Sequence, residues 1–274
     1  VGDGFTLTTT AAIADGKTIN GVGSIAITNI DGSTDLSSVT VTTVNATILD
    51  GADISGNGDL GTVDNFQLGS SNATMSIAQH LLVNSGSGGS NTVTLSDSGT
   101  VSGNAAVETY QLADAANNVF TTNAAGQTVT GGSSGDTITG VAGNDTIIGG
   151  GGADTIKGGT GEDVLTGGTG ADIFVFESTD SAGGSNIFSD TDLSGGLNHG
   201  DKFVGSFDIV RDFVSGTDQI NLDSTDAENL TFFNQGYTGT EIYVDADNVT
   251  AGMINVPVGF ALLIRGEFNE TSDQ

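Results

Sequence analysis

The sequence has no cysteine, no tryptophan, a single proline and only two histidines among its 274 residues. Without cysteine the chain has no disulfide, no thiolate zinc site and no cysteine nucleophile. With only His80 and His199 it cannot form the H-E-x-x-H motif of zinc proteases. No apolar run is long enough for a membrane-spanning helix, which needs about 20 residues. The chain begins at Val1 without the features of a signal peptide, and we expect it to be a fragment or a processed form.

Basic residues are almost as scarce. The chain has 5 Lys and Arg and 34 Asp and Glu, which gives a net charge of −29, and 27 of the acids are Asp. Such a surface repels nucleic acid and anionic lipid, so we expect neither as a partner and no membrane insertion.

Glycine is the residue that the chain has in excess, with 44 copies, while only 14% of the residues are charged. Long helices use Ala, Leu, Glu, Lys and Arg, so this composition favours short strands joined by many turns.

A nine-residue period runs from residue 131 to residue 175. The five units are GGSSGDTIT, GVAGNDTII, GGGGADTIK, GGTGEDVLT and GGTGADIFV. The sixth position of each unit is an aspartate: Asp136, Asp145, Asp154, Asp163 and Asp172. The eighth position is apolar, and the same phase continues backward with Asn118 and Gln127 where the aspartate would stand.

The glycines permit tight turns and the last three residues of each unit form a short strand, so two successive units make one coil. Coils about 4.8 Å apart would stack Asp154 between Asp136 and Asp172, and Asp145 beside Asp163. Two carboxylates at that spacing repel by about 3 kcal/mol. A folded coil therefore needs a hard cation, and Ca²⁺, which accepts several oxygen ligands in flexible geometry, suits it better than Mg²⁺.

These units resemble the repeat-in-toxin (RTX) calcium-binding repeats, G-G-x-G-x-D-x-U-x, and three of them match the glycines and the aspartate in full. The resemblance implies a parallel β-roll with Ca²⁺ along both edges and the five aspartates as ligands. A flexible Gly/Asp linker is the weaker alternative, because linkers do not place an apolar residue at every ninth position.

Downstream, residues 207–222 resemble the segment that follows the repeats in many RTX proteins, where it closes the roll and leads into the type I secretion signal. Asp208, Asp212 and Asp218 lie in this segment, and surface solvation is favoured for them over a further ion site. Two alternating apolar runs are predicted as strands of the cap, residues 240–244 and 260–264.

Upstream, a looser pattern of apolar residues recurs, and its first three copies start at equal spacing, at Ile25, Val44 and Val63. It indicates an irregular β-helix, with a β-sandwich as the runner-up. Residues 131–135 match G-x-S-x-G and residues 56–61 match G-x-G-x-x-G, but both matches are expected by chance in so glycine-rich a chain. His80, among apolar neighbours, is interpreted as a structural residue of a strand or short helix rather than a ligand.

The sequence thus predicts an all-β protein, an elongated right-handed parallel β-helix or solenoid leading into an RTX parallel β-roll with a β-rich C-terminal cap. The predicted domains are 1–117 (solenoid), 118–175 (roll) and 176–274 (cap and secretion region). The expected function is that of a non-enzymatic, calcium-dependent, extracellular structural protein of a bacterial surface layer or matrix. The alternatives are the delivery and folding domain of a secreted toxin, lipase or protease, and an adhesin.

Expected partners are further copies of the chain in a lattice, cell-surface polysaccharide and the type I secretion machinery. Within the repeats the stacking of every second unit makes Asp154 the one aspartate that serves two complete pairs. Asp136 and Asp172 are expected to be the ends of that stack.

Overall fold

The computed structural model describes residues 1–84, 90–114, 117–176, 187–189, 202–204, 208–214, 217–222, 232–234 and 262–267. Within these residues nearly all regular structure is β-strand, and the two α-helices have four residues each. Every described strand pair is parallel except one, an antiparallel pair of β19 (Ile187–Ser189) with β20 (Lys202–Val204). None of the helices in these ranges is long and apolar enough to span a membrane. The predicted all-β solenoid architecture is confirmed.

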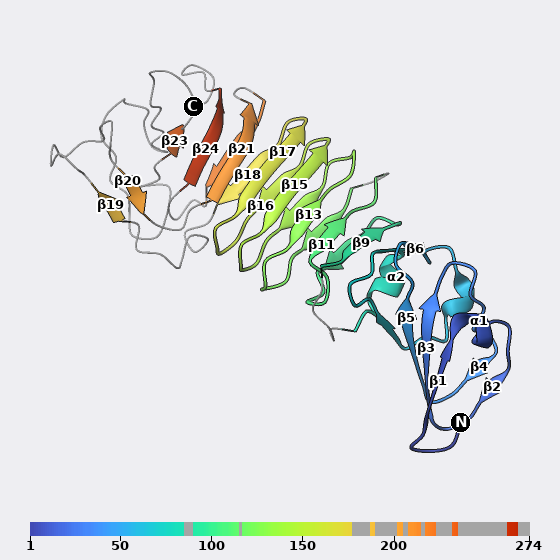
Figure 1. Cartoon of the computed structure of the whole chain (residues 1–274). Helices are drawn as coiled ribbons and strands as arrows, with labels where there is room; N and C mark the ends of the chain where they lie inside the picture. The colour runs from blue at the N-terminus through green and yellow to red at the C-terminus, as the bar shows by residue number, and fades with distance from the viewer. Residues whose placement is uncertain are drawn as a thin grey trace. The chain divides into compact units, whose positions relative to one another are not determined.

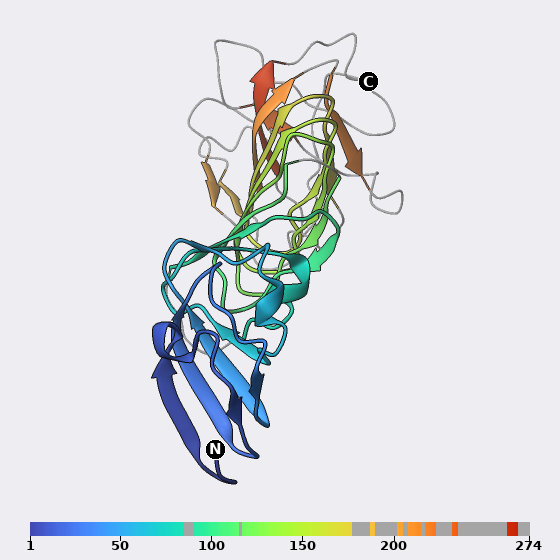
Figure 2. The same ribbon diagram turned by 90° about the vertical axis from the view of Figure 1, so that its right-hand side faces the viewer.

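The chain divides into two compact units, Val1–Asp114 and Ala115–Gln274. The first unit contains the elements β1 (Thr6–Thr10), α1 (Ala11–Ala14), β2 (Ile19–Asn20), β3 (Ser24–Ile30), β4 (Val39–Thr40), β5 (Thr43–Ile48), β6 (Ala52–Asp53), the 3₁₀ turn η1 (Gly58–Leu60), β7 (Asn65–Gln67), β8 (Ala73–Met75), α2 (Ile77–His80), β9 (Thr92–Leu95), β10 (Thr100–Ser102) and β11 (Thr109–Gln111). Strands β1, β3, β5 and β7 lie side by side in one sheet, drawn in blue in Figures 1 and 2. Strands β11, β9, β8 and β6 follow one another in a second sheet, and β2 pairs with β4.

The loose upstream pattern corresponds to stacked coils of this unit, which rules out the β-sandwich alternative. Ile25 stands opposite Val44, as the equal spacing predicts, and both side chains are buried. The next step is longer by one residue, because Ala46 pairs with Phe66. Val63 is therefore not the partner of Val44, although it is also buried. Each strand keeps its alternation of inward and outward side chains, so the connection between the strands accommodates the extra residue.

The second unit contains the repeats. Its elements are β12 (Val119–Thr121), β13 (Thr128–Thr130), β14 (Thr137–Thr139), β15 (Thr146–Gly151), β16 (Thr155–Lys157), β17 (Val164–Thr169), β18 (Ile173–Phe176), β19, β20, β21 (Asp208–Val214), β22 (Gln219–Leu222), β23 (Phe232–Asn234) and β24 (Leu262–Glu267). One sheet has the order β12-β14-β16-β18-β22 and the other runs β13-β15-β17-β21-β24-β23. Successive strands between β12 and β18 thus alternate between the two sheets (Figure 1).

The strands of the repeats pair in the predicted register, in which each repeat stacks on the next but one. Ile138 faces Ile156, which faces Phe174, and all three side chains are fully buried. Ile147 stacks on Leu165 in the other sheet in the same way. The apolar eighth positions therefore form the core of the roll.

Strand β24 covers residues 262–264 of the second apolar run predicted for the cap, and it pairs with β21 and β23. The first predicted run, residues 240–244, lies outside the described residues.

Candidate metal centre

The glycine-rich turns bring one aspartate of each repeat inside the roll. In the third repeat, residues 149–157, Gly150 and Gly152 have φ of 106° and 105°, in the left-handed region that favours glycine. The first glycine has a different role, because a Cβ on Gly149 would lie 2.3 Å from Oδ2 of Asp154. Gly149 thus leaves space for the carboxylate of its own repeat. The turn pattern by itself did not predict this requirement.

The five predicted aspartates are all buried, with exposed fractions of at most 2%. In the first column the N–H of Asp136 donates to Oδ1 of Asp154 over 2.6 Å, and the N–H of Asp154 donates to Oδ1 of Asp172 over 2.9 Å. In the second column the N–H of Asp145 donates to Oδ1 of Asp163 over 2.7 Å. The predicted stacking in two columns is confirmed.

The inner carboxylates of the first column lack partners for their second oxygen. Among the described residues, Oδ2 of Asp154 and Oδ2 of Asp172 are buried without a hydrogen bond. Burial raises the pKa of Asp154 to about 6, and the charges of Asp172 and Asp136 add to the rise. Burial also raises the pKa of Asp172, with a further contribution from Asp218 and Asp212. A buried carboxylate without a partner is costly, so this arrangement favours a bound cation.

Neutral groups close the N-terminal ends of both columns. The backbone N–H and the side-chain amide of Asn118 donate to Oδ1 of Asp136 over 2.7 and 2.9 Å. Thr122 donates its hydroxyl to Oδ2 of Asp145, and the N–H of Gln127 donates to Oδ1. Burial nevertheless raises the pKa of Asp145 to about 6. Asn118 and Gln127 occupy the position of the period that is aspartate in the repeats, but they are uncharged. They thus lie where the two columns begin.

At the C-terminal end the structure corrects the sequence prediction. Asp218, expected to be solvated at the surface, is only 8% exposed, and its Oδ1 accepts the N–H of Asp172 over 3.0 Å. The first column therefore continues beyond the repeats. Asp212, which is partly exposed, accepts the N–H groups of Gly167 and Gly168 over 2.9 and 2.7 Å, so it binds the backbone of the last repeat.

The donor set suits calcium. Within the described residues no three acidic or histidine side chains gather into one cluster, so side chains alone do not form a cage. Each interval of a column instead offers carboxylates from two coils. The space that a Cβ on Gly149 would fill is bordered by Oδ2 of Asp154 and by the carbonyl oxygen of Gly167, so turn backbone lies close to the carboxylate. Ca²⁺ accepts such a mixture of carboxylate and carbonyl oxygens in flexible geometry. The residues present fit the ion, and the assignment of the five aspartates as its ligands stays a prediction.

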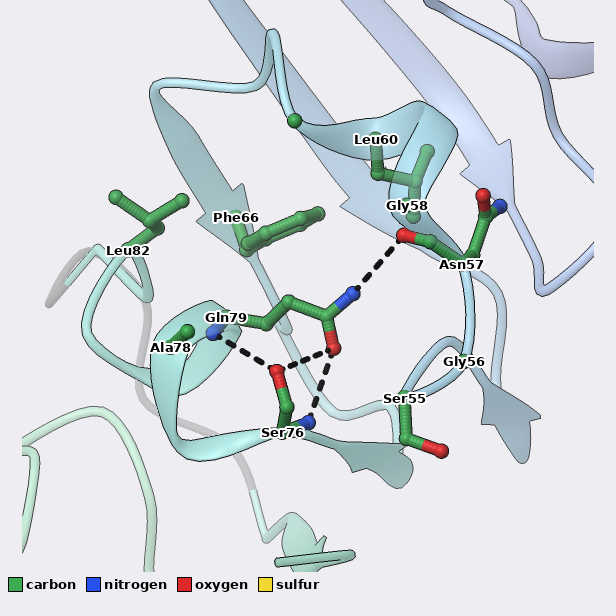
Figure 3. Close-up of a pocket in the computed structure, with 11 residues that line it drawn as sticks. Ser55, Gly56, Asn57, Gly58, Leu60, Phe66, Ser76, Ala78, Gln79 and Leu82 are labelled. Atoms are coloured by element: carbon green, nitrogen blue, oxygen red, sulfur yellow. Dashed lines mark hydrogen bonds between the residues drawn. The ribbon is translucent and has the colours of Figure 1, made fainter.

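The glycine motif at residues 56–61 does not lead into a phosphate-binding helix, because η1 is followed by β7. It borders a hollow of about 370 Å³, whose lining includes Ser76 and Gln79 (Figure 3). The side-chain amide of Gln79 donates to the carbonyl oxygens of Ile54 and Asn57, and its Oε1 accepts from Ser76. These polar groups hold the loop and the helix together.

His80 ends the short helix α2 and is buried, in agreement with the structural role predicted for it. Its Nε2 lies 2.7 Å from the hydroxyl of Tyr110, which accepts the N–H of Asn104 over 2.8 Å. The Tyr110 hydroxyl can accept from Asn104 with either tautomer of His80, and that tautomer decides which partner donates in the bond to Nε2. His199 lies outside the described residues.

Acid is expected to destabilise the first unit through His80. Burial lowers the pKa of His80 to about 4, so between about pH 6.5 and pH 4 the unfolded chain binds a proton that the folded unit does not. The free energy of unfolding should fall as the pH is lowered through this window. An NMR titration of the His80 ring, assigned by its loss in His80→Gln, measures the pKa directly. A value near 6.5 would contradict the burial argument.

Comparison with known proteins supports the repeats and no more of the chain. A search of curated proteins gives no match to this sequence. The family model of the RTX calcium-binding nonapeptide repeat matches residues 130–165 and 148–178. These matches span the coils that carry both aspartate columns, and RTX nonapeptide repeats bind calcium. Residues 130–178 are therefore identified as RTX calcium-binding repeats, with Ca²⁺ as the ion of this roll.

Proposed function

We propose that the chain is a calcium-folded, extracellular structural module of a bacterial surface layer or matrix, and that its role is not catalytic. The observation that carries the proposal is the buried carboxylate column, in which Oδ2 of Asp154 and of Asp172 has no hydrogen-bond partner among the described residues. Such a column is stable with Ca²⁺ between the carboxylates and strained by their repulsion without it.

This chemistry suits secretion through a type I exporter. The bacterial cytosol holds little free Ca²⁺, whereas extracellular calcium modules bind at about 10⁻⁴ to 10⁻³ M. Repulsion between aspartates would keep the repeats unfolded before export, and calcium outside the cell would fold them. Pulse-labelled export into medium with and without calcium tests the proposal: secreted chain should resist protease only in medium with calcium, and equal resistance in both media would refute it.

The surface of the first unit suits assembly through divalent ions. Lys17 is its only basic residue, while acids recur along its length. Asp53 is exposed, and Asp31 and Asp35 are partly exposed. Hydrogen bonds from Ser55, Ser33 and Ser37, respectively, are the largest cause of their lowered pKa. They stay ionised at neutral pH, so neighbouring copies repel one another unless cations bridge them. Acidic cell-surface polysaccharide would be held in the same way.

Self-association is expected to require more calcium than folding does. Light scattering during a calcium titration should show a monomer when the β-structure is complete and larger particles as calcium rises further into the millimolar range, above the roughly 10⁻³ M of folding. Sodium chloride at equal ionic strength is the control, because screening alone should not assemble the chain. A monomer throughout the titration would favour the alternative of a folding domain attached to a toxin or enzyme.

A further inference from the structure

The first aspartate column continues beyond the repeats, next to strand β22. Strand β22 pairs with β18 in the register that joins successive coils, with Ile173 opposite Gln219 and Phe174 opposite Ile220. The separation along the chain between equivalent positions is 46 in place of the 18 found within the repeats, so additional chain intervenes. The coil nevertheless resumes with the same hydrogen bonding, as the N–H of Gln219 donates to the carbonyl oxygen of Asp172 over 2.7 Å.

Asp218 stands directly before β22, as Asp172 stands directly before β18. Its Oδ1 accepts the N–H of Asp172 over 3.0 Å, and within the repeats Oδ1 of Asp172 accepts the N–H of Asp154 over 2.9 Å. The pair Asp172 and Asp218 thus repeats the arrangement of the pair Asp154 and Asp172. Both members are buried, at 1% and 8% exposed.

The pair has an unsatisfied oxygen of its own. Oδ2 of Asp172 is buried without a hydrogen-bond partner among the described residues, and it points at Gly167, where a Cβ would come within 2.3 Å. Asp212 holds the N–H of this same glycine, which brings a further negative charge to the region. Neutral donors such as Asn118 and Thr122, which close the N-terminal ends, have no counterpart at this oxygen in the part of the chain that the structure describes.

We propose that Asp172 and Asp218 form a further calcium site at the junction between the last repeat and the C-terminal strands. The proposal rests on the calcium-dependent folding proposed above and adds a residue that lies outside the matched repeats. The junction ion joins β22 to the roll, so the C-terminal strands dock only after the repeats have bound calcium.

Asp218→Asn tests the site, because the amide oxygen still accepts the N–H of Asp172 while the charge is lost. In the full chain, equilibrium dialysis with radioactive Ca²⁺ should count one calcium ion fewer for Asp218→Asn than for the unaltered protein. Hydrogen exchange should find the Gln219 amide protected by calcium in the unaltered protein and unprotected in the variant. Glu162→Gln is the matched control, since Glu162 is an exposed acid of the roll outside the columns, and it should leave both readouts unchanged.

The outcomes separate the two proposals. An unaltered protein that binds no calcium would refute the proposed function. A full complement of ions in Asp218→Asn, with Gln219 still protected, would overturn the junction site alone. If the variant fails to fold, which exchange at β14 and β16 would reveal, the unaltered protein still decides: protection of Gln219 that does not depend on calcium overturns the proposal.

Discussion

Removal of calcium is expected to unfold the repeats while the first unit stays folded. In the roll the five aspartates are buried and stack in three pairs, 136 with 154, 154 with 172 and 145 with 163. Each pair repels by about 3 kcal/mol at the spacing of adjacent strands. With at least three pairs, the repulsion is comparable to the whole stability of a small domain. The described coils of the first unit contain no such column and stack through side chains such as Ile25 and Val44.

Hydrogen exchange with and without chelator measures this result segment by segment. The amides of β14 to β17 should exchange at rates close to those of an unfolded chain once calcium is removed. The amides of β3 and β5 are the internal control and should keep their protection. Equal protection of the repeats in both conditions would mean that the roll does not depend on calcium.

Asp154→Ala is expected to raise the calcium concentration at half-folding more than Asp136→Ala does. Asp154 lies between two carboxylates, so its loss damages two intervals of the column, whereas the loss of Asp136 damages one. Each substitution also leaves one buried N–H without its acceptor, that of Asp136 or that of Asn118, so this cost of about 1–3 kcal/mol is common to both variants. Asp136 stands at an end where Asn118 and the N–H of Gly132 already hold its carboxylate.

The expected difference between the two variants is at least about tenfold in the calcium midpoint, since about 1.4 kcal/mol is a factor of ten. Circular dichroism during calcium titration measures it, and Asp154→Asn separates the lost charge from the lost acceptor. Sequence spacing places Asp172 at an end of the column, and it therefore predicts a small shift of the calcium midpoint for Asp172→Ala. Because Asp218 extends the column, Asp172→Ala should instead shift the midpoint as much as Asp154→Ala does. A midpoint for Asp172→Ala as low as that of Asp136→Ala would contradict a role for Asp218, and equal shifts in all variants would contradict the pairing of coils.

The repeats show how far the sequence alone determines the structure. A fixed period of nine repeats the same turn and the same short strand, so equal coil lengths impose the register of the strands, the core of eighth positions and the two columns. These features were predictable because each depends on neighbours at a constant separation. The pattern before the repeats has no strict period, and there one additional residue between β5 and β7 moved the partner of Val44 away from Val63.

Tertiary structure decided what no period could indicate. Asp218 joins the first column from a distant part of the chain, because β22 can pair with the open edge of β18 whatever the length of the intervening chain. Its burial follows from that pairing and not from its local sequence, which resembles a solvated loop. The first glycine of each repeat likewise needed the folded coil for its explanation, since Gly149 makes space for a carboxylate that only the turn brings back to it. Sequence spacing thus determined the contacts between residues at a constant separation along the chain. Hydrogen bonding at the edge of β18 determined the position of Asp218, and the space around the buried carboxylates determined the need for the first glycine of each repeat.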